Sequence, residues 1–307
     1  MKSIIKRGVP ASLFARLVDV RTAWQVRHEF GVDRRRYAKA MLPDDHYVRP
    51  GLTGRNLEAQ LTKDYHRVEK GLALAEPRQP FGAAVLERID LLLPTATGGS
   101  YVEHATTARE ALVEWNGGNS AIGDVSPVRG ERHGLEDAEA FFGSRHSVRD
   151  FSDRPVDQET LNRAVALAIN TPSVCNRQAW HVRFYRRPAV ARILSFQNGN
   201  AGFRESTPVV ALVTVDLQMF AGAGERNQGW IEGGLFSMSF VWALHALGLD
   251  TCMLNMSVLN DQADAVRAEV GIAGNELVIM MIAVGYGRDG HRRARSPRRT
   301  ADEVIRS

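Results

Sequence analysis

Residues 145–151 read Arg-His-Ser-Val-Arg-Asp-Phe, and a short helix-like run over residues 135–142 precedes them. In this segment Arg145 and Arg149 bracket Ser147. A guanidinium group presents a rigid fork of N–H donors that matches phosphate and carbonyl oxygens, so two of them beside a hydroxyl can surround one planar or anionic ligand. Taken alone, the segment is also compatible with solvated charges at the end of a helix.

A second polar segment lies about twenty residues further along the chain. Residues 171–180 read Thr-Pro-Ser-Val-Cys-Asn-Arg-Gln-Ala-Trp and run into a strand-like stretch at 181–185. Proline, serine and asparagine favour a turn. Short amide and hydroxyl side chains donate and accept hydrogen bonds simultaneously, which the edge of a flavin ring requires. The two segments together indicate a site for a planar polar ligand.

Both segments resemble motifs of the FMN-dependent nitroreductase family, which are Arg-[Arg/His]-Ser-x-[Arg/Lys]-x-Phe and Pro-Ser-x-x-Asn-x-Gln-Pro-Trp. They occur here in that order and at a family-like separation. Ala179 stands where the family usually has proline, a change that removes no polar contact. The resemblance continues through a long helix-like run at 228–249, a Leu-Gly-Leu-Asp turn and a buried strand-like run at 277–287, and covers roughly residues 135–307.

The fold implied by this resemblance is α+β, with a nitroreductase-like central mixed β-sheet flanked by helices. The family forms an intertwined homodimer that holds FMN at the subunit interface. The residue pattern agrees, because a capped helix is predicted at 158–170, a β-branched strand at 208–215 and a further helix from about 260 to 270.

The resemblance also implies the reaction. NADH or NADPH would deliver hydride to flavin N5 and leave, and a small-molecule acceptor would then take its place on the same face in a ping-pong cycle. The flavin carries such chemistry, so no catalytic side chain is expected. This agrees with the lack of a Ser-His-Asp or paired-carboxylate pattern in the sequence.

The residues implied as FMN contacts come from four parts of the chain. The turn residues are expected to come from the partner subunit, with the glutamine supporting that turn, and residues 253–256 stand where some family members have Pro-Ile-Glu-Gly. The basic tail holds six arginines between 288 and 299 and is expected to supply a phosphate contact. The candidates are Arg145, His146, Ser147 and Arg149; Pro172, Ser173, Val174, Asn176 and Gln178; Arg204, Met253, Leu254, Asn255 and Met256; and Arg298 and Arg299.

Composition sets the class of protein. The chain has 307 residues, of which 44% are hydrophobic, so it can bury a substantial core. Its two cysteines provide neither a disulfide framework nor a metal-ligand cluster. The amino end lacks the apolar core of a signal peptide, and no run of about eighteen apolar residues occurs. We therefore expect a soluble, cytoplasmic protein.

Residues 1–130 are predicted to form a helical N-terminal extension, joined by a glycine- and proline-rich linker at about 116–131 to an FMN-binding domain at 131–307. Helices are expected at 56–74, 81–93 and 101–115. Residues 1–40 hold ten Lys or Arg and three acids, a net charge of 10 − 3 = +7, and carry a helical apolar stripe that includes Leu13, Leu17 and Trp24. Packing of this helix on its own domain is favoured over a weak contact with an anionic membrane, and no nucleic acid is expected.

Two alternatives to a nitroreductase-type enzyme stay open at this point. One keeps the flavin for another redox chemistry, such as dehalogenation or azoline oxidation. The other is a non-catalytic assembly or attachment protein with a vestigial flavin pocket. The long extension, which has no counterpart in the minimal family fold, motivates the second alternative.

Overall fold

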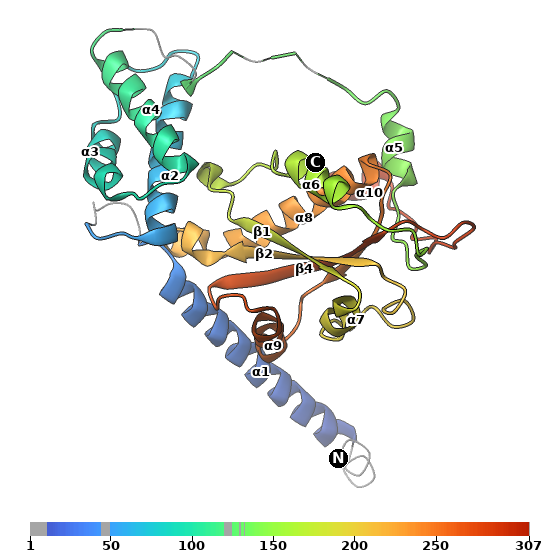
Figure 1. Cartoon of the computed structure of the whole chain (residues 1–307). Helices are drawn as coiled ribbons and strands as arrows, with labels where there is room; N and C mark the ends of the chain where they lie inside the picture. Colours follow the sequence, from blue (N-terminus) through green and yellow to red (C-terminus); the bar gives the residue numbers. More distant parts are fainter. Residues whose placement is uncertain (1–10, 44–49, 120–124, 129, 132, 307) are drawn as a thin grey trace.

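A computed structural model describes residues 11–43, 50–119, 125–128, 130–131 and 133–306 of the chain (Figure 1). Helices and strands alternate along the second half of the chain, from the helix at 158–168 to the strand at 276–285. The elements are α1 (Ala11–Ala40), α2 (Gly54–Leu72), α3 (Ala83–Leu92), α4 (Ser100–Asn116), α5 (Ala138–Ser144), α6 (Gln158–Ala168), β1 (Trp180–Arg186), α7 (Ala189–Leu194), β2 (Val209–Asp216), α8 (Gln228–Ala246), β3 (Asp250–Asn255), α9 (Asn260–Val270), β4 (Glu276–Gly285) and α10 (Ala301–Val304).

The four strands form one sheet in the order β1-β2-β4-β3, and every neighbouring pair is antiparallel. The α+β class is thus confirmed, but the strands do not pair in the mixed arrangement that the resemblance implied. Among the described residues, parallel pairing is confined to two isolated bridges, Leu42 with Ala221 and Ser147 with Thr251. Each bridge joins single residues, which is too little contact for a strand, and only Thr251 of the second bridge lies on a strand of the sheet.

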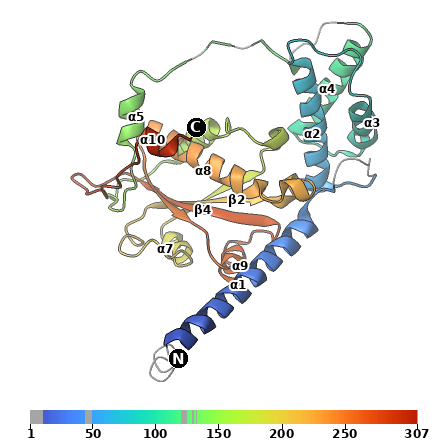
Figure 2. The ribbon, with the colours of Figure 1, turned by 180° about the vertical axis from the view of Figure 1, so that it is seen from behind.

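Helices cover both faces of the sheet (Figures 1 and 2). α6 and α8 pack on one face, and α7 and α9 pack on the other. β2 is completely buried between them, as its β-branched sequence predicts. α8 approaches β4 closely because Gly233 has no side chain; a Cβ there would lie 2.6 Å from Cγ1 of Ile279. α8 therefore packs closely against the sheet, and the two together position the neighbouring segments.

The outer side of α8 carries an apolar stripe. Ile231 and Leu235 are 53% and 45% exposed, and Met238 and Trp242, which follow at helical spacing, are half-buried. A helix that is apolar on all sides is normally covered on all sides. The stripe is thus a surface suited to a partner.

α2, α3 and α4 enclose a hydrophobic cluster of their own, in which Leu61, Val68 and Leu112 are fully buried. Polar contacts tie α2 to the sheet. Arg55 Nε donates to Asp216 at the end of β2 at 3.2 Å, and Asn56 Nδ2 donates to the carbonyl oxygen of Gln218 at 2.8 Å. The predicted helices in this region are confirmed, and α2 is held at a fixed place against the sheet.

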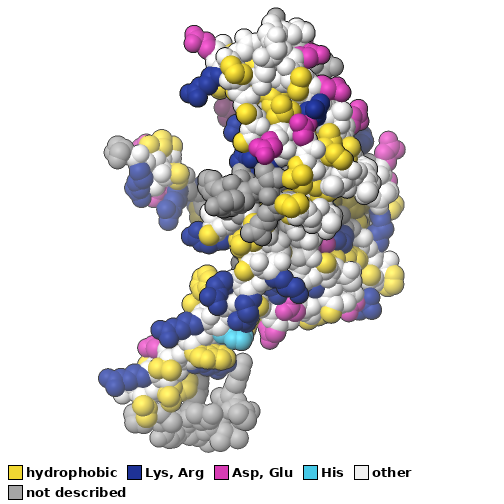
Figure 3. Space-filling model, turned by 90° about the vertical axis from the view of Figure 1, so that its left-hand side faces the viewer, with side chains coloured by type: hydrophobic (Ala, Val, Ile, Leu, Met, Phe, Trp, Pro, Cys, Tyr) yellow, Lys and Arg dark blue, Asp and Glu magenta, His cyan; other side chains and the backbone are white. Residues whose placement is uncertain are grey.

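α1 departs from our expectation that it would pack on its own domain. Leu13, Leu17 and Trp24 are 50%, 55% and 65% exposed, and α1 projects at the bottom of the view in Figure 3 with hydrophobic and basic side chains along it. Thirty helical residues span about 45 Å, so the helix extends beyond the sheet that its last turns contact. Its contacts begin near Glu29, whose carboxylate accepts a hydrogen bond from the first backbone N–H of α9, that of Asn260, at 2.8 Å.

Among the described residues, no helix combines the length and the apolar character that crossing a membrane would need.

A partly buried ion pair in the sheet leads to a pH-dependent prediction. Arg183 donates from both terminal nitrogens to the two carboxylate oxygens of Glu276 at 2.8 Å, and Thr214 donates to the same carboxylate. Burial by itself would raise the pKa of Glu276, but the hydrogen bonds from Arg183 and Thr214 and the guanidinium charge outweigh it and lower the pKa overall. The folded state therefore binds this proton less tightly than the unfolded state does.

The resulting stabilisation is present above the unfolded pKa of about 4.3 and is lost as pH falls through the folded pKa. We expect Glu276→Gln to lower the free energy of unfolding by about 1–3 kcal/mol at pH 7, and this difference should shrink below about pH 4. Urea unfolding between pH 3.5 and 7 measures it, with the exposed Glu110→Gln as the control. A difference that stays constant over this range would show that ionised Glu276 does not stabilise the fold.

Candidate functional site

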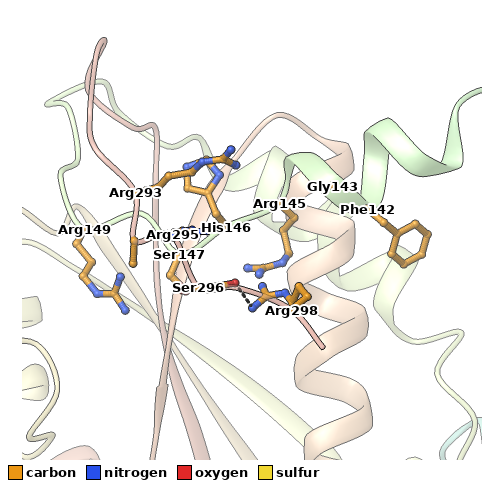
Figure 4. Close-up of a pocket in the computed structure, with 11 residues that line it drawn as sticks. Phe142, Gly143, Arg145, His146, Ser147, Arg149, Arg293, Arg295, Ser296 and Arg298 are labelled. Carbon is orange, nitrogen blue, oxygen red and sulfur yellow. Dashed lines mark hydrogen bonds between the residues drawn. The ribbon is translucent and has the colours of Figure 1, made fainter. Parts of the chain in front are cut away.

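A pocket of about 330 Å³, here called the arginine pocket, lies where α5, the segment after it and the C-terminal tail meet (Figure 4). Its polar side chains come from two stretches that are far apart in the sequence. The lining residues are Phe142, Gly143, Arg145, His146, Ser147, Arg149, Arg293, Ala294, Arg295, Ser296 and Arg298.

Local structure explains how the first motif reaches this pocket. Asp137 caps α5 by accepting a hydrogen bond from the N–H of Ala140, and α5 ends at Ser144. The chain is then hydrogen-bonded to β3, since the N–H of Val148 donates to the carbonyl oxygen of Thr251 at 2.9 Å. Val148 and Phe151 are fully buried. The polar residues before them, at 145–147, are thereby left at the pocket.

The electrostatics of the arginine pocket favour an anion. Five arginines line it, and in the described part of the chain it has no acidic lining residue. Burial, followed by repulsion from Arg298, lowers the pKa of Arg145. Figure 4 shows the guanidinium groups of Arg145 and Arg298 close together. A phosphate placed between them would relieve this repulsion and accept charge-assisted hydrogen bonds.

His146 connects the motif to the tail. Its Nδ1 lies 2.9 Å from the carbonyl oxygen of Ser144, and its Nε2 lies 3.1 Å from Nε2 of His291. The rings of the two histidines also stack, with their centroids 5.4 Å apart. This contact holds the start of the tail beside the motif, so the tail arginines reach the same pocket.

The structure distinguishes between the two predicted tail arginines. Arg298 lines the pocket, whereas Arg299 is not among its lining residues. Sequence reasoning did not select Arg293 and Arg295, which also line it. The signal for them was the run of arginines itself, which has no periodicity that would rank one above another.

The amide-rich turn lies elsewhere in the molecule. A 3₁₀ turn, η4 (Val174–Asn176), forms its centre, and Cys175, Asn176 and Gln178 adopt left-handed backbone angles with φ of 48°, 52° and 47°. The N–H of Val174 donates to Glu232 Oε1 of α8 at 2.7 Å. The turn is thus attached to the amino-terminal half of α8.

The first motif is attached to the opposite end of the same helix. Ser144 Oγ lies 2.9 Å from Nε2 of His245. Glu232 and His245 are 245 − 232 = 13 residues apart in α8, a separation of about 20 Å at the α-helical rise. The single chain therefore does not bring the two motifs into one cavity.

The turn instead lines a second cavity of about 370 Å³, here called the turn cavity. Its other walls come from α2, α4 and β1. The lining residues are Arg55, Glu58, Thr62, Tyr65, Glu69, Ser100, Tyr101, His104, Asn176, Arg177, Gln178 and His181. Of the predicted turn residues, Asn176 and Gln178 lie here, and Pro172, Ser173 and Val174 precede them without lining the cavity.

The remaining predicted residues line neither the arginine pocket nor the turn cavity. Leu254 and Met256 are buried in the core at 4% and 3% exposure. The Met256 N–H donates to the carbonyl oxygen of Ile279 at 3.3 Å. Arg204 Nε donates to Asn200 at 2.7 Å. Met253 and Asn255 lie on β3 beside these residues.

Fold and site together define an α+β protein with an arginine-lined pocket beside the carboxyl end of a long central helix. The sequence model of the nitroreductase family matches residues 143–194 and 186–286. Residues 143–286 are thus similar to the nitroreductase family, and α1 to α4 precede this region as an N-terminal helical extension.

Individual relatives are distant. Nitroreductase NfnB of Mycolicibacterium smegmatis is 24% identical over 198 residues, covering 50% of this chain and 83% of the relative. A protein of Archaeoglobus fulgidus, provisionally named NADH dehydrogenase/NAD(P)H nitroreductase, is 23% identical over 158 residues, covering 50% of this chain and 88% of the relative. A solved nitroreductase family protein from Streptococcus pneumoniae TIGR4 is 21% identical, with a TM-score of 0.48 and coverage of 55% of this chain and 98% of that structure.

Proposed function

We propose that this protein is an FMN-dependent NAD(P)H oxidoreductase of nitroreductase type that passes hydride to a small-molecule acceptor. The observation that carries the proposal is the arginine pocket, whose five arginines lack an acidic neighbour among the described lining residues. The match of residues 143–286 to the nitroreductase family and the names of the relatives, which include NAD(P)H nitroreductases, support the same function.

Each part of the pocket has a role in this proposal. Arg145, Arg149 and Arg298 would bind the FMN phosphate and the neighbouring oxygens, because guanidinium forks match phosphate geometry. Ser147 would bind the ribityl chain. When bound, the flavin supplies the hydride-accepting and hydride-donating ring, in a ping-pong cycle with NADH or NADPH and then the acceptor. The chain itself positions the ring and excludes water.

A homodimer would complete the site. The two motifs lie at opposite ends of α8, and the outer stripe of α8, which includes Ile231 and Leu235, is apolar and uncovered. Two copies could pair these stripes about a two-fold axis, with their α8 helices antiparallel. The arginine pocket of each copy would then lie beside the turn of the other copy. Ser173 and Asn176 of the partner subunit would then close over the flavin ring.

Reconstitution tests the proposed function. Purified full-length protein, incubated with FMN and passed through a desalting column, is expected to retain about one FMN per chain. Anaerobic addition of NADH or NADPH should bleach the flavin absorbance, and the reagent that does so faster identifies the reductant. Gel filtration should report a dimer. A preparation that retains no FMN, or whose bound FMN neither nicotinamide reduces, would contradict the proposal.

A further inference from the structure

His146 and His291 meet through nitrogen atoms that would both be acceptors if the two rings were neutral. Nδ1 of His146 lies 2.9 Å from the carbonyl oxygen of Ser144, and Nδ1 of His291 lies 2.8 Å from the carbonyl oxygen of Arg288. A carbonyl oxygen only accepts hydrogen bonds, so each Nδ1 carries a hydrogen atom and donates it. In a neutral imidazole the other nitrogen, Nε2, is then an acceptor.

The two Nε2 atoms nevertheless lie 3.1 Å apart, which is hydrogen-bond distance. Two acceptors at this distance would turn their lone pairs toward each other and repel. One added proton converts the repulsion into a hydrogen bond, in which an imidazolium donates to a neutral imidazole. The contact therefore requires one positive charge on the pair of rings.

We propose that His146 and His291 share one proton between their Nε2 atoms, and that this proton holds the C-terminal tail at the arginine pocket. His291 is then a positioning residue, which acts on the ligand through the tail arginines. Phosphate binding in the pocket and uptake of a proton from solvent favour each other. This coupling rests on the proposed function, because FMN supplies the phosphate.

His291 stands where it can control the position of the tail. It comes two residues before Arg293, the first tail residue that lines the pocket, and His146 lines the same pocket. On the other side of His291 the chain is fixed, because the N–H of Arg288 donates to the carbonyl oxygen of Asp150 at 3.0 Å. The histidine contact thus lies between a fixed segment and the pocket-lining arginines.

Three neighbouring groups are compatible with a charged pair. Asp250, on β3, lies beside His291: a Cβ added to Gly287 would lie 2.7 Å from His291 Nδ1 and 2.9 Å from Asp250 Oδ2. This carboxylate favours a positive charge on the ring. The charge of Arg288 is offset by Asp150, since their side chains pair at 3.1 Å. From α8, His245 contacts the hydroxyl group of Ser144 and not the pair itself.

The arginines of the pocket oppose the shared proton until an anion binds. They come from the motif and from the tail, and they are Arg145, Arg149, Arg293, Arg295 and Arg298. A phosphate group carries about −1.5 to −2 charges at pH 7 and offsets this repulsion. The proton in turn keeps the tail arginines at the phosphate. By linkage, each ligand strengthens the binding of the other by the same factor.

The test measures the dissociation constant of FMN for the full-length protein at pH 6.5 and at pH 8.5, because an imidazole ordinarily loses its charge as pH rises toward 8. His291→Gln keeps a hydrogen-bond donor on the side chain but cannot take up a proton. The ratio of the constant at pH 8.5 to that at pH 6.5 should be about fivefold larger in the wild type than in His291→Gln, as expected for one hydrogen bond. Ionisation of the FMN phosphate affects both proteins equally and cancels in this comparison.

Two further variants separate the proton from a structural role. His291→Ala removes the donor as well, so it should bind FMN about fivefold more weakly than His291→Gln at both pH values. His133→Gln makes the same change at an exposed position before α5, and it should keep the wild-type ratio. A ratio in the wild type equal to that in His291→Gln, or a ratio in His291→Ala equal to that in the wild type, would overturn the inference.

A second measurement needs no flavin. ¹⁵N NMR of the full-length protein labelled at histidine follows the protonation of each ring nitrogen between pH 5 and 9. Because one proton is shared, the resonances of His146 and His291 should change together, and His291→Gln should alter the titration of His146. An unaltered titration of His146 would overturn the inference while the oxidoreductase function stands. Failure of the wild type to bind FMN would overturn the proposed function, whereas a joint titration in the same protein would still support the shared proton.

Discussion

Arg145→Ala is expected to weaken FMN binding about 10- to 100-fold, since a hydrogen bond to a charged group contributes about 1.5–3 kcal/mol. Arg145 is half-buried over the ring of Trp242, 5.8 Å from its centroid, and faces Arg298 without an acidic neighbour in the described pocket lining. A phosphate there would bind to two guanidinium groups that otherwise repel each other. The dissociation constant of FMN is measured from the fluorescence that FMN recovers when it is released from the protein.

Two controls sharpen this result. Arg145→Lys keeps the positive charge but loses the forked array of donors. Its dissociation constant for FMN should therefore lie between those of the wild type and Arg145→Ala. Arg299→Ala should bind FMN like the wild type, because Arg299 is not among the lining residues of the arginine pocket. Equal dissociation constants for wild type and Arg145→Ala, in folded protein, would show that the phosphate binds elsewhere.

Asp64→Ala is expected to lower the free energy of unfolding of the extension by about 3–5 kcal/mol. Asp64 is fully buried and accepts from Arg88 Nη2 at 2.6 Å, from Gln60 at 2.7 Å and from Arg67 at 3.2 Å. Alanine would remove the carboxylate that accepts three hydrogen bonds from the buried Arg88 guanidinium, and this loss costs more than the loss of an exposed ion pair.

Urea unfolding followed by tryptophan fluorescence measures the loss, since Trp115 lies on α4. The matched control is Asp90→Ala, which breaks a pair with Arg109 whose two side chains are 44% and 39% exposed and should cost less than about 1 kcal/mol. Equal losses for the two variants would show that Asp64 does not compensate Arg88. If only the extension unfolds, FMN retention in the arginine pocket should persist.

Local patterns predicted most of the elements. The helix expected at 158–170 is Gln158–Ala168, and the strand expected at 208–215 is Val209–Asp216. The periodicity of apolar residues and a capping Asp157 decide these elements, and both are local properties of the chain. The first motif likewise lies at a pocket, because Val148 and Phe151 are buried beside it.

Long-range packing decided what the sequence could not predict. The separation of the two motifs follows from their attachment to opposite ends of α8, which no spacing along the chain encodes. The stripe through Leu13 and Leu17 shows which residues share a helical face, but it does not show whether the domain reaches that face. The approach of α2 and α4 to the turn is also a tertiary contact, so Tyr65 and His104 gave no signal in the sequence.

The length of α8 between its two attachments has a consequence for how activity depends on concentration. In the proposed homodimer, each protomer would contribute one half to each of two flavin sites. It would supply the arginine pocket to one site and the turn to the other, and these two parts lie about 20 Å apart. Dilution below the dissociation constant of the dimer would then abolish turnover reversibly, while every protomer stayed folded. Dimerisation would restore the activity.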